Sequence, residues 1–177
     1  MTNAKLAILS LIAESPRHGY EIEQIIEERG MREWTEIGFS SIYYILKQLE
    51  KSSLIDSQLR PAEGRGPARR VYQITQEGWK TLEETTLEAL TTPKQSFPSI
   101  LLGMANLPIL SQKQSLAALR TYQDGLIKRL THVALQAESQ HPLPDHVEML
   151  FDYSLRMLEA EKGWVENVIQ HLKEKQK

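Results

Sequence analysis

Cysteine is absent from the 177-residue sequence. A chain without thiols forms no disulfides, thiolate zinc sites or iron–sulfur clusters, and it has no cysteine nucleophile. Such a chain suits a reducing compartment, and we expect it in the cytoplasm. No apolar run approaches the roughly 18 residues of a membrane span. The apolar stretch at residues 6–13 lacks the basic lead and the cleavage site of a secretory signal, so we expect neither secretion nor membrane association.

An excess of charge of one sign is absent too, since 21 basic residues stand against 23 acidic ones and the formal net charge is −2. Bulk charge therefore does not indicate a nucleic-acid binder. The arginines are nevertheless clustered: Arg60, Arg65, Arg69 and Arg70 fall in one short stretch with only Glu63 opposing them. Salt screens charges beyond about 10 Å. A local basic patch on a neutral chain can therefore still bind a polyanion.

The residues that enzymes use are poorly placed. The histidines, at positions 18, 132, 141, 146 and 171, show no metal-ligand spacing on one element. Glu159 and Glu161 stand two residues apart and cannot share a helix face. Gly64 and Gly66 precede a predicted strand rather than a helix, so they form no phosphate loop, and no serine has a nucleophile-elbow context. We expect no enzyme, no metal site and no cofactor.

The first thirty residues are typical of two helices. Residues 3–13 are apolar nearly all round, which indicates a buried helix that ends at Ser15-Pro16. A second helix is predicted over residues 19–28 and closes at Gly30. Its expected inner face consists of Tyr20, Ile22, Ile25 and Ile26.

A third helix is predicted to begin at Ser40-Ser41, which are both good N-cap residues. Its apolar stripe has helical spacing and consists of Ile42, Ile45, Leu46 and Leu49. The other side carries Tyr43, Tyr44, Lys47 and Gln48. These side chains form either a solvated helix face or a surface that recognises a partner.

After residue 51 the pattern changes to alternation. Residues 54–59 and 70–74 read as the two strands of a β-hairpin, and residues 61–68 form its long tip. Thr75 is a good N-cap for a fourth helix with apolar residues Trp79, Leu82, Leu87 and Leu90. Three helices followed by a hairpin is the order of a winged helix-turn-helix, and it places the clustered arginines at the wing.

A winged helix binds DNA by placing the start of its third helix in the major groove. Hydroxyl and ammonium groups there suit phosphates and base edges. Arginines at a deformable wing suit phosphates or the minor groove, although a charged hairpin can instead only keep a sheet edge soluble. The combination of both elements favours DNA binding. The alternative is a winged-helix protein-interaction module that does not bind DNA.

The second half of the chain carries two long heptad seams after a proline-containing segment at residues 91–98. The first seam consists of Leu116, Leu119, Gln123, Leu126, Leu130, Val133 and Ala137. The second consists of Phe151, Leu155, Leu158, Lys162, Val165, Ile169 and Leu172. Such seams close either between two chains or on each other as a helical hairpin. A third arrangement combines the two: both helices pair within the chain, and one remaining face, which includes Trp164, contacts a partner chain.

Three runs resemble segments of the PadR family of transcriptional regulators, the phenolic-acid-responsive repressors and their relatives. Residues 17–22 (RHGYEI) resemble the start of the family's second helix, and residues 40–50 (SSIYYILKQLE) resemble its recognition helix. Residues 66–78 (GPARRVYQITQEG) resemble its wing and the turn that follows. Together the runs cover about residues 5–80 in the family's order. Tyr44 stands where many members have proline.

The resemblance implies a mainly α fold with a small β-hairpin wing. It implies a winged helix-turn-helix DNA-binding domain at residues 1–90, a linker with a short helix at 91–110, and a helical dimerisation domain at 111–177. The implied function is a homodimeric repressor that binds a palindromic double-stranded operator. Members of the family release DNA on binding a small effector, a phenolic acid for some and a hydrophobic drug for others.

The candidate DNA-binding residues are Tyr20, Ser40, Ser41, Tyr43, Tyr44, Lys47, Arg65, Arg69 and Arg70. The candidate dimerisation residues are Leu155, Leu158, Lys162, Trp164, Val165, Ile169 and Leu172. No effector site is assigned. Trp34, Trp79 and Trp164 are candidates for stacking on an aromatic ligand, and their alternative role is in the hydrophobic core.

Overall fold

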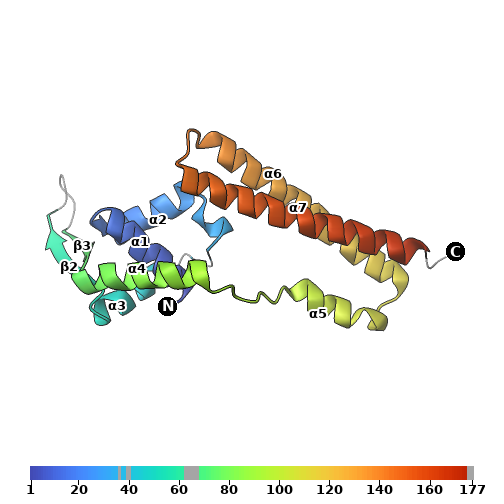
Figure 1. Ribbon diagram of the computed structural model, residues 1–177, viewed down its shortest axis with the longest axis horizontal. Coiled ribbons are helices and arrows are strands. Elements are labelled where there is room, and N and C mark those ends of the chain that lie inside the picture. The colour runs from blue at the N-terminus through green and yellow to red at the C-terminus, as the bar shows by residue number, and fades with distance from the viewer. Residues whose placement is uncertain (36, 39–40, 62–67, 175–177) are drawn as a thin grey trace. The chain divides into compact units, whose positions relative to one another are not determined.

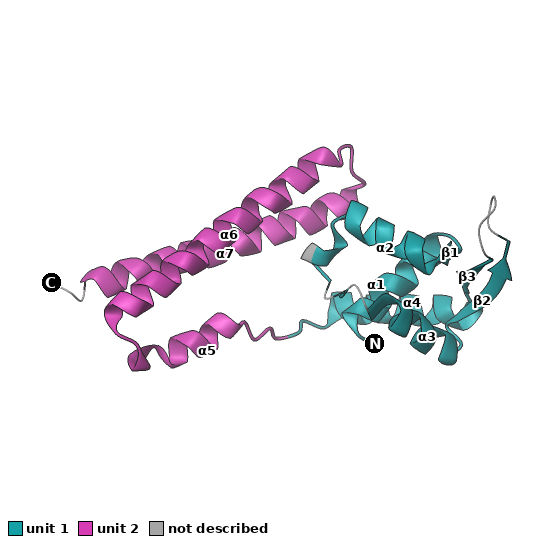
Figure 2. Ribbon diagram, turned by 180° about the vertical axis from the view of Figure 1, so that it is seen from behind, with its two compact units in different colours: residues 1–94 teal, residues 95–177 magenta. Residues whose placement is uncertain are grey.

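The computed structural model describes residues 1–35, 37–38, 41–61 and 68–174 (Figure 1). The chain divides into two compact units, Met1–Lys94 and Gln95–Lys177 (Figure 2). The fold is mainly α with one small antiparallel sheet, which confirms the predicted fold class.

The first unit is built on helices α1 (Asn3–Glu14), α2 (Gly19–Glu28), α3 (Ser41–Lys51) and α4 (Gln76–Thr91). A short 3-10 helix, η1 (Met31–Glu33), follows α2. α1 is central to the core, as its apolar composition predicts. The fully buried side chains of the unit come from helices α1, α2 and α3 and from the first long strand: Ile8, Leu9, Leu11, Ile12, Ile22, Ile26, Ile42, Leu46, Leu49 and Ile55.

The sheet has three strands rather than the predicted two. Strands β2 (Ile55–Arg60) and β3 (Arg69–Ile74) form the expected hairpin, paired from Ile55 opposite Ile74 to Arg60 opposite Arg69. A short strand β1 (Arg17–His18) pairs with the other edge of β3, so the order is β1-β3-β2. Two residues are too few to show an alternating pattern, and for that reason the sequence does not predict β1.

The junction between the sheet and α4 requires a glycine. The Thr75 hydroxyl accepts a hydrogen bond from the Gly78 backbone N–H (2.9 Å), which confirms Thr75 as the N-cap of α4. The Thr75 backbone N–H donates to the Leu54 carbonyl (3.1 Å). This brings the start of α4 so close that a Cβ on Gly78 would lie 2.1 Å from the Leu54 oxygen.

Two predicted inner faces need correction. Tyr20 was expected inside with the isoleucines of α2, but its side chain is 57% exposed because it lies at the first turn, beside the sheet rather than over α1. On α4 only Leu82 packs against the core. Trp79, Leu87 and Leu90 are exposed, so this helix shows a second, uncovered apolar side within its own unit.

The second unit contains α5 (Ser99–Ala105), a 3-10 helix η2 (Leu107–Ile109), α6 (Gln112–Ser139) and α7 (Asp145–Glu174). Helices α6 and α7 lie side by side along their lengths (Figures 1 and 2). The two heptad seams therefore close on each other within the chain. The buried residues of this interface are Leu119, Leu126, Val133, Phe151, Leu158, Val165 and Ile169.

The polar residues of the two seams meet at one carboxylate. Gln123 of α6 donates a hydrogen bond to Glu166 (3.0 Å), and the Lys162 ammonium lies 3.6 Å from the same Glu166 oxygen. Nearby, the Tyr122 hydroxyl donates to Glu161 (2.6 Å). Burial and this hydrogen bond raise the pKa of Tyr122 to about 12. These contacts fix the register of α6 against α7.

Most of the predicted dimerisation residues pack within the chain. Leu158, Val165 and Ile169 are buried against α6 of the same chain, and Leu155 and Leu172 are partly buried there. Their side chains are therefore used within the chain. A heptad seam indicates that a helix packs against another helix, but it does not indicate whether that helix is in the same chain. Trp164 lies outside this interface and is 37% exposed.

Candidate nucleic-acid interface

Helix α3 presents a polar face to solvent. Ile42, Leu46 and Leu49 are buried, and this anchors one side of the helix in the core. On the opposite side Tyr43 is 59% exposed and Tyr44 is 64% exposed, with Lys47 exposed one turn further on. The predicted division of this helix into an apolar and a polar side is confirmed.

Helix α3 begins at Ser41, where the sequence predicts its start. Ser40 lies outside the described residues. Ser41 is half-buried, and its hydroxyl and backbone N–H both point to the Gly38 carbonyl. Its hydroxyl therefore donates within the loop, and only its oxygen lone pairs are left for another partner.

The start of α2 lies next to this face and is held by a capping box. The Glu21 backbone N–H donates to Nδ1 of His18 (3.1 Å), and the His18 backbone N–H donates to the Glu21 carboxylate (2.8 Å). Two backbone donors at the helix start are thus satisfied reciprocally. The imidazole of His18 is stacked on the ring of Tyr20, with centroids 6.3 Å apart.

An open cleft of about 410 Å³ lies where β1, α2, α3 and β3 meet. Its lining residues are His18, Gly19, Tyr20, Tyr43, Arg69, Arg70 and Tyr72. A Cβ on Gly19 would lie 2.6 Å from Cε1 of Tyr43, so the missing side chain lets the Tyr43 ring rest on the first turn of α2. The cleft combines aromatic walls with two guanidinium groups.

Two of the wing arginines, Arg69 and Arg70, lie at this cleft. Nη1 of Arg69 is 2.9 Å from Nε2 of His18, and Nη1 of Arg70 is 3.5 Å from a carboxylate oxygen of Glu50. Glu50 also accepts a hydrogen bond from the Ser57 hydroxyl. Burial raises the pKa of Tyr72, which forms the floor beneath these groups. Arg65 lies outside the described residues.

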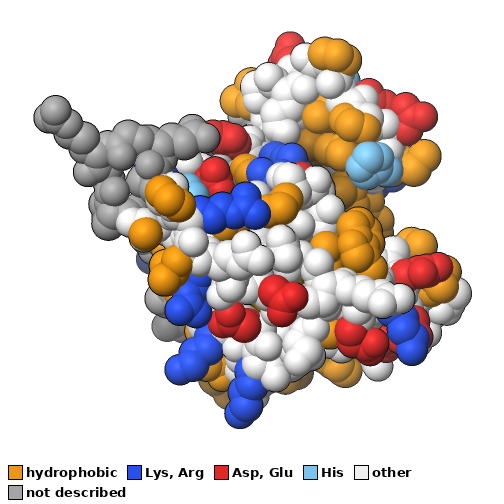
Figure 3. Space-filling model, turned by 90° about the vertical axis from the view of Figure 1, so that its left-hand side faces the viewer, with side chains coloured by type: hydrophobic (Ala, Val, Ile, Leu, Met, Phe, Trp, Pro, Cys, Tyr) orange, Lys and Arg blue, Asp and Glu red, His pale blue; other side chains and the backbone are white. Residues whose placement is uncertain are grey.

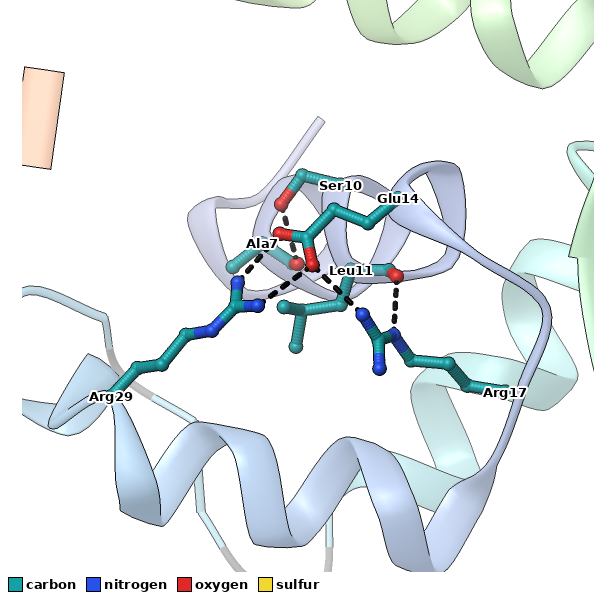
Figure 4. Close-up of polar contacts among 6 residues, drawn as sticks. All are labelled: Ala7, Ser10, Leu11, Glu14, Arg17 and Arg29. Atoms are coloured by element: carbon teal, nitrogen blue, oxygen red, sulfur yellow. Dashed lines mark hydrogen bonds and ion pairs between the residues drawn. The ribbon is translucent and has the colours of Figure 1, made fainter. Parts of the chain in front are cut away.

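A carboxylate at the end of α1 holds the segment that precedes and follows the start of α2 (Figure 4). Glu14 accepts two hydrogen bonds from Arg29 (2.6 and 2.9 Å) and one from Arg17 (2.8 Å). Arg17 also donates through Nε to the Leu11 carbonyl (2.9 Å). These bonds tie both ends of the β1–α2 segment to α1. The Arg29 guanidinium lowers the pKa of Glu14.

Charge on the face shown in Figure 3 is mixed. Figure 3 shows Lys and Arg side chains in several groups, separated by apolar and uncharged side chains and by carboxylates. Binding of a polyanion here would therefore depend on a few placed cations rather than on a broad basic surface. Among the described residues no three His, Asp or Glu side chains converge as metal ligands.

The structure brings four of the predicted DNA-binding residues together with one residue, His18, that the sequence analysis did not single out. Tyr20, Tyr43, Arg69 and Arg70 line one cleft, while Tyr44 and Lys47 continue the exposed side of α3. His18 was not among the candidates. The signal available for it was its position three residues before Glu21 at the start of a helix, the spacing of a capping box.

Comparison with known proteins identifies the family. A model described as the transcriptional regulator PadR-like family matches residues 8–84. The chain belongs to the PadR-like family of transcriptional regulators. This match confirms the family that the resemblance of the helices and the wing predicted. Uncharacterized protein X of Lysinibacillus sphaericus is 35% identical over 81 residues, which are 46% of this chain and 72% of that protein.

Solved structures extend the likeness to the second unit. Bacillus subtilis PadR in complex with operator DNA has a TM-score of 0.78 at 19% identity, over 95% of this chain and 98% of that one. The same protein in complex with p-coumaric acid has a TM-score of 0.75 at 19% identity, over 96% and 98%. The PadR-like regulator BC1756 of Bacillus cereus has a TM-score of 0.73 at 17% identity, over 98% and 99%. The PadR-like chain shares their fold.

No helix among the described residues is both long and apolar enough to cross a membrane.

Proposed function

We propose that this PadR-like regulator is a cytoplasmic repressor that binds a palindromic operator as a homodimer and is released by a small effector. The observation that carries DNA binding is the exposed side of α3 directly beside a cleft lined by Arg69 and Arg70. Base-edge hydrogen bonds would come from Tyr43, Tyr44 and Lys47 in the major groove. Phosphate contacts would come from the cleft and the wing.

The experiment is a fluorescence-anisotropy titration of the protein with the duplex upstream of its own gene, against random DNA at several salt concentrations. We expect tight, salt-steep binding to the first duplex, because each neutralised phosphate contributes about −0.9 to the log–log slope. Lys47→Ala should weaken it. Lys51→Ala is the matched control, since Lys51 ends the same helix and recognition contacts come from the helix start. An absence of binding at low salt would favour the protein-interaction module.

The proposed dimer uses the side of α7 that is turned away from α6. Met149, Tyr153 and Met157 are 69%, 65% and 54% exposed and stand four residues apart, on one helix face that also carries Trp164. Large apolar residues exposed together are typical of a protein interface. A dimer places two recognition helices about 34 Å apart, as a palindrome with half-sites one turn apart requires.

The dimer has its own test. Met157→Glu introduces a charge into the proposed interface and should convert dimers to monomers in analytical ultracentrifugation. Loss of the dimer should also weaken operator binding, since only one half-site is then engaged per protein. A variant that remains a dimer would place the interface elsewhere.

An aromatic effector is supported by the tryptophans, none of which is buried. Trp34, Trp79 and Trp164 are 40%, 52% and 37% exposed. The core alternative therefore applies to none of them, and each ring has a free surface on which a ligand could stack. Quenching of tryptophan fluorescence by p-coumaric acid, with loss of operator binding, tests this proposal. An unchanged operator affinity in saturating p-coumaric acid would exclude that compound as the effector.

A further inference from the structure

The contact between His18 and Arg69 holds two hydrogen-bond donors against each other. Nδ1 of His18 accepts a hydrogen bond from the Glu21 backbone N–H, and an imidazole nitrogen accepts only through a free lone pair. A neutral ring with a free Nδ1 carries its proton on Nε2. Nε2 is therefore a donor, and a guanidinium has no acceptor at all. The 2.9 Å between Nε2 and Nη1 of Arg69 thus separates two donors.

Among the described residues, no acceptor in the cleft satisfies this pair. The carboxylate oxygen nearest to Nε2 of His18 is Oε1 of Glu21, at 3.6 Å, and this distance is beyond hydrogen-bond length. The other Glu21 oxygen already accepts from the His18 backbone. Glu50, the carboxylate nearest to the second cleft arginine, is engaged by Arg70 and by Ser57.

The geometry points to an oxyanion that is shared by the two donors, and we propose that it is one backbone phosphate of the bound DNA. A phosphodiester oxygen accepts from Nε2–H and from the guanidinium together, and it turns an unfavourable donor pair into two charge-assisted hydrogen bonds. The His18 side chain is only 13% exposed and is fixed by its cap, so its donor is oriented before DNA arrives. The inference rests on the proposed function.

His18 has a substitution that separates this role from its structural one. Asparagine is among the best N-cap residues, and its side-chain oxygen can accept from the Glu21 N–H as Nδ1 does. His18→Asn therefore keeps the cap and removes the Nε2 donor. Arg69→Gln removes the cationic donor. Arg60→Gln is the matched control. Arg60 stands opposite Arg69 in the hairpin but outside the cleft, so this substitution makes the same change of charge away from His18.

The test measures affinity by fluorescence anisotropy on the duplex upstream of the gene and on random DNA. We expect His18→Asn and Arg69→Gln each to weaken binding about ten-fold on both duplexes, the order of one hydrogen bond to a charged group. Arg69→Gln should lower the salt slope by about 1, whereas His18→Asn should leave it unchanged because a neutral imidazole displaces no counterion. The affinity of the double variant, His18→Asn with Arg69→Gln, should fall by less than the product of the two single fold-losses. His18→Asn combined with Arg60→Gln should lose the full product.

A scan of single methylphosphonates along the duplex locates the phosphate. At one position in each half-site the neutral substitution should weaken the wild type and leave His18→Asn unchanged. Wild-type affinity in His18→Asn, with its circular dichroism and urea midpoint retained, would overturn the inference and leave the proposed function standing. If the fold-losses of affinity in His18→Asn and Arg69→Gln multiply in the double variant, the two residues do not share a phosphate. Failure of the wild type to bind any DNA would overturn both the inference and the proposed function.

Discussion

Gly78→Ala tests how the sheet is joined to α4. An added Cβ would lie 2.1 Å from the Leu54 carbonyl oxygen and 2.7 Å from Cγ1 of Ile74, distances that real Cβ atoms essentially never show. The Leu54 oxygen cannot move freely, since it accepts from the backbone N–H of Thr75 (3.1 Å) and from the Thr75 hydroxyl (3.1 Å). The methyl group must therefore displace the start of α4 or break these hydrogen bonds.

The magnitude follows from opposing effects. Overpacking costs about 1–3 kcal/mol, and each lost hydrogen bond costs about 1 kcal/mol. Alanine in place of glycine within a helix returns at most about 1 kcal/mol. We expect Gly78→Ala to lower the free energy of unfolding by about 2–4 kcal/mol, measured by urea denaturation followed by circular dichroism.

The matched control is Gly125→Ala in α6, where an added Cβ meets no atom within 4 Å. There only helix propensity acts, so the substitution should stabilise by up to about 1 kcal/mol. Tryptophan fluorescence in a Trp164→Phe background assigns the effect to the first unit, because only Trp34 and Trp79 then report. A Gly78→Ala variant as stable as the wild type would refute the reasoning.

Three further outcomes are expected. Gly19→Ala places a Cβ 2.6 Å from the Tyr43 ring. Because that ring can swing away, operator affinity should fall about five-fold or more with little loss of stability, and an unchanged affinity would show that the position of Tyr43 does not matter for binding. Lys47→Ala should weaken specific binding by about 1–3 kcal/mol if the ammonium reads a base, but should weaken binding to all sequences alike if it holds a phosphate; anisotropy on both duplexes distinguishes these. The pKa of Glu14 is lowered in the folded chain by Arg29, so its contribution to stability is present above its ordinary pKa of 4.5 and is lost as the pH falls through the lowered value. Glu14→Gln should therefore be less stable than the wild type at neutral pH, and the difference in urea midpoint should vanish in acid; a constant difference would contradict this assignment.

The helices of the first unit could be predicted because each has an apolar pattern or a clear boundary residue. The spacing of Ile42, Ile45, Leu46 and Leu49 determines which side of α3 is buried. The exposure of the two tyrosines on the other side follows from it. Thr75 and Gly30 mark helix ends through local chemistry alone. Such features depend on neighbours along the chain.

The cleft could not be predicted in the same way, because it depends on contacts between distant residues. Arg69 meets His18 across 51 positions of sequence, and β1 exists only because β3 pairs with it. The seams of α6 and α7 have the same limitation. Their pattern is equally compatible with a partner in the same chain and in another, and only the packing of Val165 and Leu158 against α6 distinguishes the two.

The central claim is that α3 and the adjoining cleft bind DNA, and the most direct measurement is anisotropy of the duplex upstream of the gene, titrated with the wild type, Lys47→Ala and Lys51→Ala at several salt concentrations. We predict tight, salt-steep binding by the wild type over random DNA, a marked loss in Lys47→Ala and little change in Lys51→Ala. Equal losses in the two lysine variants would contradict the assigned recognition face, and no binding by the wild type at low salt would contradict the claim itself.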